Sequence, residues 1–121
     1  VSDRAVKTDF VDVDVGAVLG QVIRLPLSSW RYIDAPGERH LGPVAQDFRA
    51  LFGLGASERT ISTVDSAGVA LAAIQGLNAK LESENAALRE DNQVMRADNA
   101  AIRSELAALR TLVESRLPKE H

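Results

Sequence analysis

The strongest constraint on this chain is a seven-residue repeat in its last third. With Leu81 at position d of a heptad written abcdefg, the repeat continues to Leu109 without an inserted or deleted residue. A strict repeat of this kind is typical of helices that pack their apolar stripes together in a coiled coil. The residues that we expect in this oligomerisation seam are Asn78, Leu81, Asn85, Leu88, Asn92, Met95, Asn99, Ile102, Leu106 and Leu109.

The charged positions of the repeat predict how the helices are oriented. Four successive heptads carry an acid at position g, and each acid is followed five residues later by an arginine at position e. Parallel, unstaggered helices bring g of one chain against e of the next, whereas antiparallel helices would oppose like charges. We therefore predict a parallel homo-oligomer. The acids are Glu84, Asp91, Asp98 and Glu105, and the arginines are Arg89, Arg96, Arg103 and Arg110.

Asparagine occupies position a in four successive heptads. Each of these amides needs a polar partner in the seam, so the asparagines lower apolar burial and specify the register of the helices. Because asparagine at position a often accompanies dimers, the repeat alone leaves two and three strands open.

The limits of the long helix follow from its flanking residues. Residues 65–117 contain no proline, and Pro118 cannot continue a helix. Asp65 or Ser66 can accept hydrogen bonds from the first amides of a helix, so we expect one of them as the N-cap. A helix of about 50 residues is about 75 Å long at about 1.5 Å per residue. A rod of this length cannot bury its own apolar stripe.

The residues before this helix carry the mixed patterns of a small globular domain. We therefore predict an α+β fold, with a globular region over 1–64, a coiled-coil helix over 65–117 and a tail over 118–121. Hydrophobic periodicity and turn residues give the elements of the globular region. They are a strand at Phe10–Val15, a helix at Val15–Arg24 closed by Pro26, a strand at Leu27–Ile33, a turn at Asp34–Gly37, a return strand at Glu38–Leu41, a helix at Val44–Phe52 ending at Gly53, and a strand at Thr60–Val64.

Composition excludes several classes of function. The 121 residues include no cysteine, so neither a disulfide framework nor a thiolate zinc site can form. The charge of -3 comes from 14 basic and 17 acidic residues without a basic run, which speaks against nucleic acid as a partner. No apolar run approaches the roughly 20 residues of a membrane span. We expect no cofactor, metal, membrane or small-molecule partner. A DNA-binding coiled-coil dimer would also need a basic segment ahead of its heptads.

The start of the chain holds a hydroxyl and an amine at a spacing that permits catalysis. Ser2 and Lys7 lie five residues apart, and a lysine amine activates a serine hydroxyl when it is unprotonated. Burial in a folded site favours the neutral amine. On spacing alone, two solvent-exposed terminal residues are the simpler interpretation. His40 has two interpretations as well, because it either assists proton transfer or is a hydrogen-bonded residue of the hairpin.

Three separated segments resemble one known family. The first is Ser2-Asp3-Arg4 with Lys7, the second runs from Trp30-Arg31-Tyr32 through Gly37-Glu38-Arg39-His40 to Phe48, and the third covers Val64–Val69 and Ala73–Leu81. Together they resemble the intramolecular chaperone domain of phage tail spikes, tail fibres and endosialidases, the self-processing peptidase family S74. The resemblance covers most of residues 2–81.

The resemblance implies a homotrimer that helps an upstream fibre or spike to fold and then cuts itself off. Since the chain begins at Val1 and not at Met, we expect the upstream region in the same polypeptide. The implied cleaved bond is Val1–Ser2, with Ser2 as nucleophile, Lys7 as base, and Asp3 and His40 in support. The implied setting is a virion tail fibre or spike precursor, assembled in the host cytoplasm, from which the cleaved domain is released. The alternative is a non-enzymatic trimerisation module of a fibre or surface protein.

Overall fold

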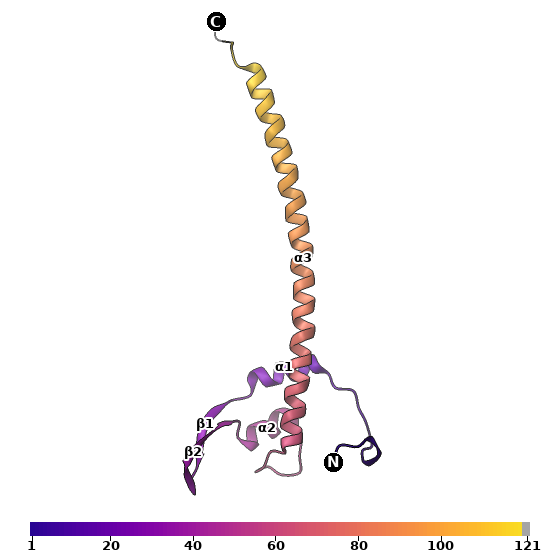
Figure 1. Ribbon diagram of the computed structural model, residues 1–121, viewed down its shortest axis with the longest axis vertical. Helices are drawn as coiled ribbons and strands as arrows, with labels where there is room; N and C mark the ends of the chain where they lie inside the picture. The colour runs from indigo at the N-terminus through magenta and orange to yellow at the C-terminus, as the bar shows by residue number, and fades with distance from the viewer. Residues whose placement is uncertain (120–121) are drawn as a thin grey trace. The chain divides into compact units, whose positions relative to one another are not determined.

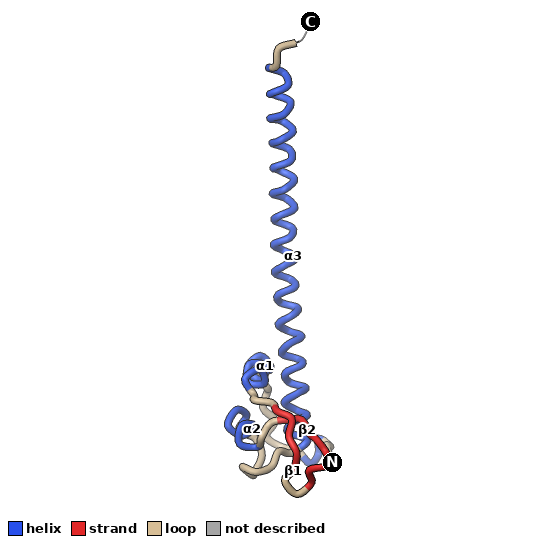
Figure 2. Tube along the Cα trace, turned by 90° about the vertical axis from the view of Figure 1, so that its left-hand side faces the viewer, coloured by secondary structure: helices blue, strands red, loops and turns tan. Residues whose placement is uncertain are grey.

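The computed structural model describes residues 1–119 and contains helices and one small antiparallel sheet (Figures 1 and 2). The chain divides into two compact units, Val1–Lys80 and the part from Leu81 onward. The predicted tail, 118–121, is described only as far as residue 119. In chain order the elements are the 3-10 helix η1 (Arg4–Val6), α1 (Val15–Arg24), β1 (Ser28–Tyr32), β2 (Ala35–Gly42), α2 (Ala45–Phe52) and α3 (Thr63–Arg116).

Helix α1 begins and ends where the sequence predicts. Asp14 is its N-cap, and its Oδ1 accepts a hydrogen bond from the Ala17 amide at 3.0 Å. The strand predicted at Phe10–Val15 is wrong, because these residues before Asp14 have no regular structure and Val15 is already helical. An extended segment becomes a strand only when it pairs with another, and none pairs with this one in the described chain.

The predicted hairpin is confirmed, but its turn is shorter than expected. Strands β1 and β2 pair antiparallel, with Trp30 opposite His40 and Tyr32 opposite Ala35. The turn lies at residues 33 and 34, and β2 begins at Ala35, ahead of the predicted start at Glu38. A register shift between Trp30 and Tyr32 marks a β-bulge, which adjusts the pairing next to the turn.

Helix α2 follows the prediction closely. Its N-cap is Val44, and it ends at Gly53, whose φ of 62° is in the left-handed region that glycine tolerates best. Phe48 and Phe52 face the same side, with ring centroids 4.8 Å apart. α2 is joined to α1 by a hydrogen bond of 2.7 Å from Gln21 Nε2 to the Leu51 carbonyl.

The start of α3 corrects two predictions. The strand predicted at Thr60–Val64 is wrong, because α3 begins at Thr63. The predicted caps Asp65 and Ser66 both lie inside the first turn, and Ser62 serves instead. Its Oγ accepts from the Val64 amide at 3.3 Å, and its carbonyl accepts from the Ser66 amide at 3.0 Å. Ser62 stands directly before the first helical residue, and its hydroxyl satisfies the amide of the second helical residue, as an N-cap does.

The core of the first unit is very small. Phe48, Val69 and Ala73 are its buried apolar residues, at 4%, 9% and 8% exposure. Two of the three come from α3, which also brings Gly76 against α1. A Cβ atom built on Gly76 would overlap the Val15 carbonyl oxygen and lie 3.1 Å from Leu19 Cβ. Helices α1 and α3 therefore approach closely only because residue 76 has no side chain.

The opposite face of α3 in this unit is exposed. Val64, Leu71 and Ile74 occupy positions a, a and d of the heptad that runs on into the repeat. Leu71 and Ile74 are each 63% exposed, and Val64 is more exposed still. The b, c and f positions face the globular part, so α3 uses one face for its own core and leaves its heptad face uncovered.

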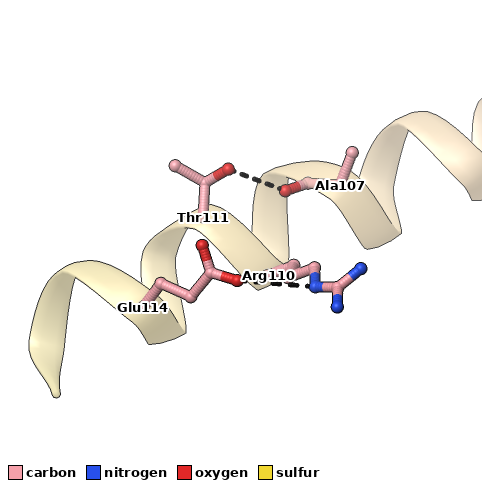
Figure 3. Close-up of polar contacts among 4 residues, drawn as sticks. All are labelled: Ala107, Arg110, Thr111 and Glu114. Atoms are coloured by element: carbon pink, nitrogen blue, oxygen red, sulfur yellow. Dashed lines mark hydrogen bonds and ion pairs between the residues drawn. The ribbon is translucent and has the colours of Figure 1, made fainter.

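The second unit is the remainder of α3, and its seam residues are also uncovered. Leu88 is 58% exposed, and the other apolar a and d residues are similar. Its polar contacts lie along a single helix (Figure 3): Thr111 Oγ1 donates to the Ala107 carbonyl at 3.0 Å, and Arg110 Nε lies 3.5 Å from Glu114 Oε1. No helix within residues 1–119 is long and apolar enough to cross a membrane.

The close approach at Gly76 predicts a large difference between two glycines of the same helix. Gly76→Ala places a methyl group against the α1 backbone and is expected to lower the free energy of unfolding by about 1 to 3 kcal/mol. Gly68→Ala is the matched control, since nothing lies within 4 Å of its built Cβ. It is expected to raise stability by about 0.5 to 1 kcal/mol. Urea unfolding at one fixed protein concentration measures both, and equal effects would contradict the close packing.

Candidate active site

The structure brings Ser2 and Lys7 together. Lys7 Nζ donates a hydrogen bond to Ser2 Oγ at 2.6 Å. The turn between them is η1, in which the Val6 amide donates to the Asp3 carbonyl and the Lys7 amide to the Arg4 carbonyl, each at 3.2 Å. This single tight turn reverses the chain, so that Lys7, five residues after Ser2, returns beside it.

Asp3 supports this turn through its side chain. It is the N-cap of η1, and its Oδ1 accepts from the Ala5 amide at 2.9 Å. The Asp3 carboxylate therefore stabilises the turn between Ser2 and Lys7, and this turn brings the two side chains together. A supporting role predicted for Asp3 thus has a physical basis in helix capping.

Two further local features shape the chain after the turn, one a backbone conformation and the other a side-chain contact. Asp9 has a φ of 56°, a left-handed conformation in which aspartate is more common than most residues. This residue redirects the chain, and the Arg4 guanidinium lies over the Phe10 ring at 5.8 Å from its centroid. That distance is within the range of a cation–π contact. The spacing of residues predicted neither the conformation of Asp9 nor the contact of Arg4 with Phe10.

The pair of Ser2 and Lys7 is open to water in a single chain. Residues 1–14 are all exposed. In this setting the amine donates to the hydroxyl, which is the reverse of what a general base must do. The arrangement has the geometry for proton transfer, and exclusion of water around Lys7 Nζ would favour the neutral amine.

His40 lies in the hairpin and not beside the pair. Its ring packs against Trp30 and Tyr32, at centroid distances of 5.0 and 5.2 Å. Figure 1 shows the N-terminal segment and the hairpin on opposite sides of the lower part of α3. The supporting role of His40 stays a prediction.

Sequence reasoning missed the aromatic cluster around His40. Trp30 and Tyr32 are two residues apart in a predicted strand, a spacing that places both on one face. Their rings contact edge to face at 4.8 Å. Trp30 Nε1 is buried and has no hydrogen-bond partner in the described chain. A buried indole N–H usually finds an acceptor, so this unpaired donor is an unusual feature of the cluster.

The predicted seam residues all lie on α3 and are exposed, from Asn78 to Leu109. The serine and lysine come from a separate segment, so the two parts of the predicted function occupy different elements. No group of three or more histidine or acidic side chains in residues 1–119 is placed to hold a metal ion.

A serine hydroxyl hydrogen-bonded to a lysine amine is the pairing that defines the Ser/Lys variants of serine hydrolases. Residues 2–53, which begin with this serine, match the family model Peptidase S74, described as chaperone of endosialidase. The match spans η1, α1, the hairpin and α2, and it confirms over this range the resemblance drawn from the sequence. Searches of curated proteins and of solved structures gave no match.

The capping role of Asp3 predicts a specific pattern of cleavage at Val1–Ser2 in a chain that carries its native upstream residues. Asp3→Ala removes the acceptor for the Ala5 amide, loosens η1 and is expected to slow cleavage about tenfold, as for an interaction of about 1.4 kcal/mol. Asp3→Asn keeps a capping oxygen and should cleave within about twofold of the parent. The rate of appearance of the cut chain by intact mass measures both. Equal slowing by the two variants would show that the charge matters and the cap does not.

Proposed function

We propose that this chain is a C-terminal intramolecular chaperone that trimerises, assists the folding of an upstream fibre or spike region, and then releases itself by autoproteolysis before Ser2. The observation that carries the proposal is the 2.6 Å contact between Ser2 Oγ and Lys7 Nζ at the start of the segment that matches the endosialidase chaperone family. The upstream region belongs to the same polypeptide, so the substrate is the chain itself.

The chemistry proceeds in two steps. Ser2 Oγ attacks the carbonyl carbon of Val1 while Lys7 Nζ takes the hydroxyl proton, and the same amine then delivers that proton to the departing nitrogen of Ser2. The Val1–Ser2 amide is thereby replaced by an ester between Val1 and Ser2 Oγ. Water hydrolyses the ester, which leaves a carboxylate on Val1 and restores the hydroxyl. One chain performs one turnover.

Assembly is the step that would switch this chemistry on. In a single chain the Lys7 amine is exposed to water. Packing of further protein around Lys7 would exclude water and favour the neutral base. Cleavage would therefore follow assembly, and loss of the chaperone would leave the upstream trimer kinetically trapped.

The uncovered heptad face of α3 supports association of copies. Apolar residues at half exposure or more run along the seam, and a soluble monomer rarely leaves such a stripe uncovered. In a parallel assembly Arg110 at position e would face Glu105 at position g of the neighbouring helix. Its contact with Glu114 in the same helix is an exposed i, i+4 pair worth only about 0.3 to 0.5 kcal/mol, so the arginine can exchange partners at little cost.

The number of copies and the setting rest on the family. The resemblance favours three strands, although the asparagine layers are also compatible with two. The endosialidase chaperone family suggests a phage fibre context. We propose that the precursor is assembled in the host cytoplasm and that the cleaved domain is released.

A second function is a trimerisation module that has lost the cleavage chemistry. It is favoured by one observation, the exposure of both Ser2 and Lys7. A lysine acts as a general base only in a site that excludes water, and exposed side chains do not form such a site.

Oligomer mass provides the first test. We expect light scattering to give about three times the chain mass of 13.0 kDa, because a parallel trimer buries the heptad face of α3. The measurement should be repeated over a range of protein concentrations, since dilution favours dissociation. A mass of two chains at every concentration would contradict the trimer and agree with the dimer preference of asparagine at position a.

Self-cleavage is tested in chains that carry several dozen native residues upstream of Val1. The parent should lose the upstream piece at Val1–Ser2, whereas Ser2→Ala and Lys7→Ala should both stay intact. Each substitution removes one of the two reacting groups, which together form the Ser2/Lys7 dyad. Because the two groups lie in one turn of one chain, mixing Ser2→Ala with Lys7→Ala copies should not restore cleavage. Intact mass over time measures all four samples. An uncut parent that still assembles would leave the trimerisation module as the function.

A further inference from the structure

The segment between the dyad and α1 has the residue pattern of a strand but no strand partner. Residues 10–13 alternate in chemistry, with Phe10 and Asp12 on one side and Val11 and Val13 on the other. All are exposed, and Val11 reaches 84%. An extended segment with exposed apolar side chains and unpaired backbone groups readily adds to the edge of a sheet.

The hairpin offers the matching surface. Two strands alone are marginally stable, and both β1 and β2 have one unpaired edge in the two-stranded sheet. One face carries Trp30, Tyr32 and His40, whose rings contact one another. Alternation places Arg31 on the other face, along with Arg39, which donates to Ser29 Oγ and to the Ser29 carbonyl at 3.1 Å each. One face therefore carries the aromatic rings, and the other carries the arginines together with Ser29 and Leu41.

The two faces of the segment complement the two faces of the hairpin. A third strand that places Val11 and Val13 on the aromatic face necessarily places Asp12 on the basic face, because side chains alternate. That register pairs apolar with apolar groups and an acid with Arg31. A slip of one residue would put Asp12 against the rings and the valines against the arginines.

A single chain does not make this contact. Figure 1 shows the N-terminal segment and the hairpin on opposite sides of the lower part of α3. Helix α1, which follows the segment directly, is fixed to α3 by the close approach of Val15 and Gly76. Residues 10–13 therefore do not reach the hairpin of their own chain, whereas a second copy carries the same segment without this restraint.

We propose that residues 10–13 of one copy pair as a third strand with the β1–β2 hairpin of a neighbouring copy, with Asp12 beside Arg31 and the valines over Trp30 and Tyr32. The proposal rests on the assembly that the proposed function requires and adds the surface through which the N-terminal segment takes part. It explains why the segment is uncovered and why the hairpin has only two strands.

This docking has a consequence for the dyad. Ser2 and Lys7 stay together within one chain, but the protein that surrounds them comes from the neighbour. The docked segment also carries the dyad toward the hairpin that holds the neighbour's copy of His40. Each cleavage site would then combine the reacting groups of one chain with the shielding surface of another, so an unassembled chain stays uncut.

Charge exchange at Asp12 and Arg31 tests the proposal. In a Ser2→Ala background, which keeps the chain intact, Asp12→Arg and Arg31→Asp should each lower the Tm by about 3 °C, and Glu90→Arg, on the outer face of the repeat, should not. Copies with Asp12→Arg refolded together with copies with Arg31→Asp should unfold above either single variant, because the exchanged charges meet between chains. Thermal unfolding followed by circular dichroism measures all samples.

Three outcomes would overturn the docking. The first is that neither charge exchange changes the Tm. The second is that the Tm recovers only when both exchanges are in one chain and never when singly exchanged chains are mixed. The third is that Glu90→Arg lowers the Tm as much as the exchanges at Asp12 and Arg31 do. The same exchanges with Ser2 intact should slow release of the upstream piece, and mixing should restore it. An uncut parent would count against self-cleavage alone, because the thermal measurement tests docking without any cleavage.

Discussion

The structure depends on one imbalance, since the chain carries far more apolar surface than a single copy can bury. Its own core amounts to Phe48, Val69 and Ala73, with Gly76 allowing α1 to approach α3. The heptad face of α3, the segment before α1 and much of the hairpin remain exposed. Hydrophobic burial is the main favourable contribution to folding, so the proposed association of copies would supply a large part of the stability of this protein.

The sequence predicts the helices of this fold well and the strands poorly. Helices α1, α2 and α3 depend on local signals, such as Asp14 at one end and Gly53 or Pro118 at the other. Strands depend on partners that can lie anywhere in the chain or outside it. Alternation at Phe10–Val15 therefore predicted a strand that has no partner in the described chain, and the same weakness produced the wrong strand at Thr60–Val64.

The candidate site was predictable in part for the same reason. Ser2, Asp3 and Lys7 meet through a local turn, and the family resemblance selected them from among the serines, acids and lysines of the chain. The surroundings of His40 depend on how the chain folds in three dimensions. Its distance along the sequence from Ser2 and Lys7 therefore did not predict its packing against Trp30 and Tyr32. The conformation of Asp9 and the contact of Arg4 with Phe10 were equally hidden, because single-residue backbone angles leave little trace in a sequence.

The short turn that joins Ser2 to Lys7 also determines how the proposed reaction would depend on concentration. Both reacting groups and the cleaved bond belong to one chain, so the chemical step is first order and has the same rate constant at any dilution. Association of three chains, by contrast, slows steeply as the protein is diluted. At low concentration the time course of release would follow assembly, and at high concentration it would reach a plateau set by the chemistry. Release of the domain would thus report when assembly of the fibre is complete.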